Sequence, residues 1–137
     1  MVNKDQGLIG NEQIEENIKK LKESFTDESL AVVLSTIRKR ILENGQFVVA
    51  VDASDVGVVN ANMALKTAGF NGKKWFVAYT SFEEELKGNI KVMSGFLADI
   101  GQIFDLTMKT EEVEGVILNP YGNMLTLNKQ IISVIKG

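Results

Sequence analysis

The stretch NMALKTAGFNGKKWFVAYTS, residues 62–81, places Asn71-Gly72 between two apolar segments. An Asn-Gly pair favours the left-handed backbone of a two-residue hairpin turn, so it predicts antiparallel strands on both sides. The earlier segment QFVVAVD, residues 46–52, is short, β-branched and aromatic, which predicts a third strand. These three strands are expected to run as an antiparallel meander.

Two helices are predicted before these strands. Apolar residues spaced four, three and four apart predict an amphipathic helix over 11–24, with Asn11 as its N-cap. A wider apolar stripe predicts a second helix over 27–43, capped by Thr26 or Asp27. The apolar residues of the first stripe are Ile14, Ile18, Leu21 and Phe25.

Short helices and strands are expected to alternate after residue 81. Ser81 and Glu84 form the S-x-x-E pattern of a capping box, which predicts a short helix over 82–87. The segment IKVMSG, residues 90–95, is then predicted to form another short strand.

Residues 96–108 repeat apolar side chains with a helical period, so a helix is expected to lie on the sheet, with Ser94 as its cap. Gly101 falls inside this helix, where glycine costs up to about 1 kcal/mol relative to alanine. Its presence predicts that another backbone approaches the helix closely.

The end of the chain carries the only proline, in Asn119-Pro120-Tyr121-Gly122. Asparagine first, proline second and glycine fourth are preferences of a type I turn, so the motif is expected to close a hairpin between GVIL and MLTL. A short helix with Asn128 as its cap is predicted to follow.

The predicted fold class is therefore α+β, a mostly antiparallel sheet with helices covering one face, preceded by an N-terminal helix pair. A length of 137 residues fits one domain. The expected organisation is a flexible N-terminal segment over 1–10 and a single domain over 11–137.

Composition excludes several kinds of chemistry. The chain has no cysteine and no histidine, so thiolate sites and serine–histidine or cysteine–histidine catalysis are absent. A net charge of −3 argues against nucleic acid as a partner. No apolar run approaches the roughly 20 residues of a membrane helix, so no membrane partner is expected. A cytoplasmic location fits, and no cofactor is predicted.

Two carboxylates follow the predicted strand over 46–52. Asp52 and Asp55 lie three residues apart, and a pair of this kind can hold a hard cation. Valine at position 56 stands where an integrin-type D-x-S-x-S site needs its third ligand, however. Asp and Ser after a strand are also ordinary turn residues, which is the favoured interpretation.

Three aromatic residues are candidates for partner contact. Trp75 and Tyr79 are expected to share one face of their strand, where packing is the favoured interpretation unless that face is open. Tyr121 occupies the exposed third position of the predicted turn.

The order of these segments resembles the N-terminal domain of the SseB family (enhanced serine sensitivity protein B) in a single-domain form. The similarity rests on Tyr79-Thr80-Ser81 followed by FEEEL, and on GVILNPYGNMLTL, residues 115–127. Ala50 stands where the family usually has proline. The resemblance implies a bacterial α+β domain with an interaction or regulatory role, and it supplies no catalytic residues.

Three functions are weighed. The favoured one is a noncatalytic protein-interaction or regulatory module with an unidentified protein partner, in a sharper form a toxin-neutralising immunity-type protein. The second is a cation-dependent enzyme or switch that uses Asp52 and Asp55. The third is a structural subunit of a homo-oligomer.

Overall fold

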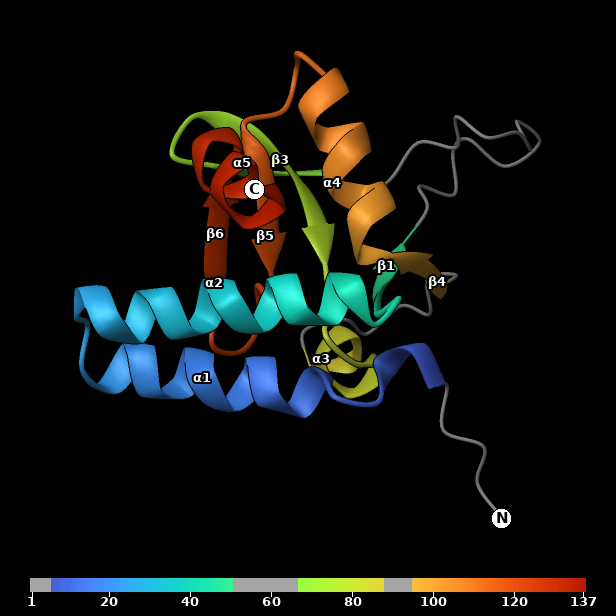
Figure 1. The fold of residues 1–137 in the computed structure, drawn as a ribbon. Helices are drawn as coiled ribbons and strands as arrows, with labels where there is room; N and C mark the ends of the chain where they lie inside the picture. The colour runs from blue at the N-terminus through green and yellow to red at the C-terminus, as the bar shows by residue number, and fades with distance from the viewer. Residues whose placement is uncertain (1–5, 51–66, 88–94) are drawn as a thin grey trace.

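The computed structural model describes residues 6–50, 67–87 and 95–137 (Figure 1). The helices within these ranges are η1 (Gln6–Leu8), α1 (Asn11–Glu23), α2 (Asp27–Leu42), α3 (Phe82–Leu86), α4 (Ile100–Lys109) and α5 (Lys129–Lys136). The strands are β1 (Gln46–Ala50), β2 (Thr67–Phe70), β3 (Lys73–Ala78), β4 (Gly95–Asp99), β5 (Gly115–Leu118) and β6 (Leu125–Asn128).

The strands form two sheets, and a bridge between β1 and the end of β3 connects them. The larger sheet has the order β2-β3-β5-β6, in which β3 and β5 are parallel and the other pairs antiparallel. The smaller sheet pairs β1 with β4 antiparallel. Val48 and Tyr79 exchange two backbone hydrogen bonds of 2.8 Å, and this bridge joins the sheets. The α+β class and the mostly antiparallel strand pairing are confirmed.

The hairpin expected at Asn71-Gly72 is present. Asn71 and Gly72 have φ values of 55° and 74°, the left-handed conformation that this turn requires, and Phe70 pairs with Lys73. The three-strand meander is wrong, however, because β1 pairs with β4 and not with β2. A hairpin turn depends on residues that are neighbours in sequence, whereas packing between distant segments determines which strand pairs with β1.

The helix predicted over 96–108 begins later than expected. Residues 95–99 form β4, and α4 starts at Ile100 with Asp99 in the N-cap position. Phe96 through Asp99 take the extended form because they pair with β1, a tertiary contact that overrides helical periodicity. Ser94 and most of the strand predicted over 90–95 lie outside the described residues.

Gly101 meets no other backbone within the described part of the chain. A β-carbon at this position would lie 3.6 Å from Cγ2 of Ile41 in α2, which is ordinary side-chain contact. The prediction of a close backbone approach is therefore wrong, and the glycine marks only the contact between α4 and α2.

Helices α1 and α2 run side by side, and α2 also packs against α4 and α5 (Figure 1). Helices α4 and α5 in turn lie against β5 and β6. The main core lies between these helices and one face of the strands, where Phe76, Ala78, Val116 and Leu118 point inward. A second, small core on the opposite face contains Val48, Val77 and Tyr79. The N-terminal helix pair and the helical cover of one face agree with the prediction.

The predicted caps are correct at three helices and wrong at α1 and at α4, where Asp99 and not Ser94 holds the N-cap position. Thr26 caps α2 with a full capping box, Ser81 accepts from the amide of Glu84 at 3.2 Å, and Asn128 accepts from that of Ile131 at 2.8 Å. Helix α1 is preceded by Gly10 with φ of 105°, and Asn11 is its first residue. Asn11 is buried because its side chain binds elsewhere, as described below.

Candidate functional site

The residues singled out for function fall in three different environments. Asp52 and Asp55 lie outside the described residues. Trp75 and Tyr79 keep only 7% and 3% of their surface exposed, whereas Tyr121 keeps 48%. Of the three aromatic candidates, Tyr121 is therefore the one that a partner reaches without rearrangement of the core.

Trp75 stabilises the β2–β3 hairpin. Its indole Nε1 donates to the carbonyl oxygen of Phe70 at 3.1 Å, and its ring meets that of Phe70 edge-on with centroids 6.5 Å apart. Both contacts stay within the hairpin. The packing interpretation therefore accounts for Trp75.

Tyr79 and Tyr121 form a stacked pair at the ends of β3 and β5. Their ring centroids are 6.4 Å apart and the ring planes differ by 23°. Tyr79 packs in the small core with Val48 and Val77, and the half-exposed Tyr121 stacks on Tyr79. Burial, followed by the nearby Tyr121 and Glu85, raises the pKa of Tyr79 to about 12, so its hydroxyl stays protonated at neutral pH.

The turn that carries Tyr121 is closed as predicted. The amide of Gly122 donates to the carbonyl oxygen of Asn119 at 3.1 Å, and β5 and β6 pair antiparallel on either side. Asn119 itself is buried and left-handed, with φ of 54°. Pro120 needs no amide bond at its position, which makes the motif a stable corner.

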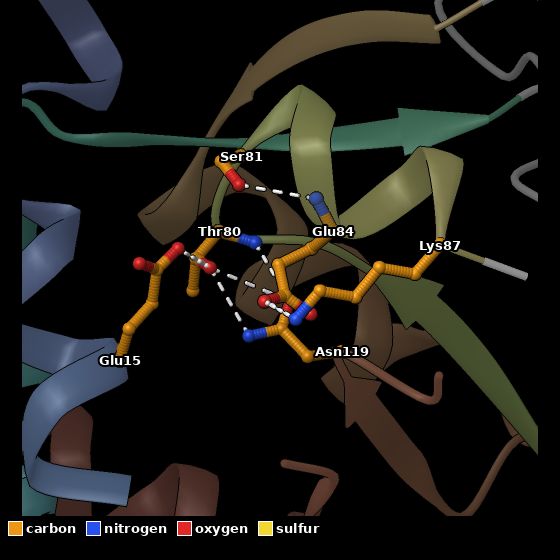
Figure 2. Close-up of polar contacts among 6 residues, drawn as sticks. All are labelled: Glu15, Thr80, Ser81, Glu84, Lys87 and Asn119. Carbon is orange, nitrogen blue, oxygen red and sulfur yellow. Dashed lines mark hydrogen bonds and ion pairs between the residues drawn. The ribbon is translucent and has the colours of Figure 1, made fainter. Parts of the chain in front are cut away.

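Asn119 also joins β5 to β3 through its side chain (Figure 2). Its Oδ1 accepts from the amide of Thr80 at 2.9 Å, and its Nδ2 donates to Oγ1 of Thr80 at 3.1 Å. The hydroxyl of Thr80 donates in turn to the carboxylate of Glu15 in α1. Thr80 is fully buried and engaged on both sides, so its hydroxyl serves the fold.

A second network lies at the start of α1. The Nδ2 of Asn11 donates to the carbonyl oxygens of Gln46 at 2.8 Å and of Thr80 at 3.0 Å. Its Oδ1 accepts from Nε of the buried Arg40 at 2.9 Å. Arg40 also binds the carbonyl oxygen of Gly7 at 2.6 Å, so these contacts tie η1, α1 and α2 to both sheets.

Helix α3 brings carboxylates beside the tyrosine pair. Glu84 binds Nζ of Lys87 at 2.7 Å through Oε2, while its Oε1 is buried against Gly122. Glu85 is only 7% exposed, and burial raises the pKa of its carboxyl group. Neither Oε1 of Glu84 nor Oε2 of Glu85 has a hydrogen-bond partner among the described residues.

These groups define the candidate site, which we call the α3 corner: Tyr79, Glu84, Glu85, Lys87 and Tyr121. It lies where the parallel strands β3 and β5 reach their carboxyl ends, a common position for binding sites in sheets with parallel strands. The candidates named from the sequence include Tyr79 and Tyr121 but not Glu85. The FEEEL pattern shows period-four spacing of Phe82 and Leu86, but it gives no sign that Glu85 points inward.

The α3 corner offers no obvious reaction chemistry. Within residues 6–50, 67–87 and 95–137, no three acidic side chains gather where they could hold a metal ion. No helix in the same ranges is long and apolar enough to cross a membrane. The arrangement is suited to binding, because it combines carboxylates with a half-exposed aromatic ring.

Comparisons with family models, with curated proteins and with solved structures found no match.

Proposed function

We propose that this chain is a noncatalytic protein-interaction or regulatory module that uses the α3 corner as its contact surface. The observation that carries the proposal is the exposure of three large apolar side chains beside buried carboxylates. Phe82 and Leu86 lie one turn apart on α3, and Tyr121 lies on the adjoining turn. Aromatic residues of this kind anchor protein interfaces.

The contact between the turn and α3 supports a single continuous surface. A β-carbon on Gly122 would lie 2.5 Å from Oε1 of Glu84 and 3.1 Å from Nζ of Lys87. The turn is therefore packed against the side chains of α3, and Tyr121 is held by stacking on Tyr79. A surface that is ordered before binding loses little conformational entropy on association.

The resemblance to the SseB N-terminal domain is a further proposal. It is supported by the Asn119-Pro120 turn and by the Tyr79-Thr80-Ser81 segment, which lie together at this corner through the bonds between Thr80 and Asn119. Both quoted motifs thus belong to one place in the fold.

Affinity capture from the source cell with wild-type and variant protein tests the interaction proposal. Tyr121→Ala is expected to release a reproducibly captured protein while it changes the free energy of unfolding by no more than about 1 kcal/mol, because the ring is half exposed. Val134→Ala, which removes an exposed apolar side chain on α5, is the matched control and should keep the partner. Capture that is equal for both variants, or no reproducible partner, would contradict the proposal.

A further inference from the structure

We propose that Asn71 is a site of spontaneous deamidation and that the fold protects the other Asn-Gly pair of the chain, Asn44-Gly45. The sequence contains these two pairs. An asparagine before glycine is the most reactive kind, because glycine has no side chain to hinder the approach of its nitrogen. Both asparagines are exposed and left-handed, with φ of 55° at Asn71 and 63° at Asn44. Exposure and backbone angle therefore do not distinguish the two pairs, and the contrast lies in the two glycines.

The reaction at Asn71 needs only the chain and water. The amide nitrogen of Gly72 bonds to the side-chain carbonyl carbon of Asn71, and the C–N bond of the side-chain amide breaks. The proton of the Gly72 amide passes through solvent to the departing nitrogen, so ammonia is released and a succinimide ring remains. Water then opens the ring at either carbonyl group, which leaves aspartate or isoaspartate at position 71. No oxidant or reductant takes part.

Gly45 is held on both sides by backbone hydrogen bonds. Its amide donates to the carbonyl oxygen of Arg40 at 2.7 Å, and its carbonyl oxygen accepts from the amide of Ile100 at 3.0 Å. Gly45 is buried, and a β-carbon on it would lie 2.8 Å from the guanidinium group of Arg40. Attack by the Gly45 nitrogen on Asn44 therefore requires the hydrogen bond to Arg40 to break and Gly45 to leave its place beside the buried guanidinium.

Gly72 has none of these restraints within the described part of the chain. No described residue accepts a hydrogen bond from its amide, and a β-carbon on it would meet no atom within 4 Å. Gly72 is exposed, as is Asn71 before it. Solvent can therefore take the proton of the Gly72 amide, which is the step that makes this nitrogen a nucleophile.

The hairpin turn sets the rate at Asn71. The side chain of a left-handed asparagine reaches the next nitrogen only after rotation about its Cα–C bond, so the closed turn must open first. This opening affects the end of the hairpin, where Phe70 pairs with Lys73. Local opening of a hairpin end costs less free energy than unfolding of a buried segment. Asn71 should therefore react more slowly than an unfolded peptide and faster than Asn44.

The two products differ in their effect on the hairpin. Aspartate leaves the main chain unchanged and suits this turn as asparagine does, so β2 and β3 stay paired. It adds one negative charge two residues before the exposed Lys73. Isoaspartate carries an extra methylene group in the main chain, which a two-residue turn between Phe70 and Lys73 cannot accommodate in the same register. Only the isoaspartate product should weaken the pairing of β2 with β3.

Incubation of the full chain at mildly alkaline pH and physiological temperature, followed by peptide mapping with mass spectrometry, tests the inference. Digestion at acidic pH prevents further deamidation during the mapping. The peptide that contains Asn71 should gain the mass of deamidation at least about tenfold faster than the peptide that contains Asn44. The matched control is the same chain incubated in urea, where both asparagines should react at similar rates because the hydrogen bonds of Gly45 are lost.

The variant Asn71→Asp provides a second measurement. Its hairpin should form as in the wild-type chain, which thermal melting checks. Ion-exchange chromatography should then show the early acidic product in the wild-type chain and not in the variant. The inference is overturned if Asn44 reacts as fast as Asn71 in the folded chain, if Asn71 stays unmodified, or if the contrast persists in urea. An early acidic product in Asn71→Asp would likewise assign the reactive site elsewhere.

Discussion

Asn119 combines two requirements in one residue. Its backbone is left-handed, which asparagine tolerates better than most residues, and its side chain binds both the amide and the hydroxyl of Thr80. The sequence placed it at the first position of a turn, which is correct. Its burial and its bonds to β3 depend on a residue 39 positions away and could not be read locally.

We expect Asn119→Ala to lower the free energy of unfolding by about 2–3 kcal/mol, because the buried amide of Thr80 loses its acceptor and alanine is strained at this φ. Asn119→Gly removes the same hydrogen bonds but accepts the backbone, so it should cost about 1 kcal/mol less. Urea unfolding measures both. Asn123→Ala, on the exposed part of the same loop, is the control and should be nearly neutral. Equal losses in the alanine and glycine variants would show that the backbone strain is negligible.

Glu85 predicts a pH dependence of stability. Burial raises the pKa of its carboxyl group above the usual 4.5. The folded state therefore resists ionisation of this group, and its stability falls as the pH rises from the usual pKa through the raised pKa. Glu85→Gln is therefore expected to be more stable than wild type at pH 7 and equal to it below the usual pKa. Thermal melting across this pH range checks the sign. A variant that is less stable than wild type at pH 7 would mean that the carboxylate makes a favourable contact in the folded chain.

At the scale of elements, the sequence predicted the features that depend on neighbouring residues. The Asn71-Gly72 turn, the Thr26 cap and the Asn128 cap are set by local backbone chemistry, and all are present. The segment over 96–99 has helical spacing but forms β4, because β1 offers it backbone hydrogen bonds. Because β1 pairs with β4, it does not pair with β2 as the expected meander requires.

Gly101 and Gly115 differ in the space available for a β-carbon. Gly101 in α4 has room for a β-carbon, so Gly101→Ala should raise the free energy of unfolding by about 0.5–1 kcal/mol. Gly115 in β5 has none, because a β-carbon would overlap the carbonyl oxygen of Leu127 and approach the backbone of Asn128. Gly115→Ala should therefore cost more than about 3 kcal/mol. Chemical denaturation of the pair measures the contrast, and similar effects at both sites would contradict the packing described.

At the scale of the whole molecule, the helix pair is joined to the strands by more than apolar contact. Asn11 binds carbonyl oxygens 35 and 69 residues away and also the buried Arg40. From the sequence it resembled an N-cap, since asparagine before a helical stripe usually is one. No local pattern reveals that its partners come from β1 and from the end of β3, which is why the role of Asn11 was missed.

Removing the hydrogen bonds of Asn11 should lower the local stability of the helix pair more than that of the larger sheet. Asn11→Ala leaves one buried carbonyl group, one partly buried carbonyl group and one guanidinium nitrogen without their partner, so we expect a loss of about 3 kcal/mol in the free energy of unfolding. Native-state hydrogen exchange should then show amides of α1 opening at lower free energy than those of β5, because β5 keeps β3 and β6 as neighbours. Gln13→Ala, on the exposed face of α1, is the matched control. If α1 and β5 lose protection equally in Asn11→Ala, the chain opens as one cooperative unit and the contact is not a separable joint.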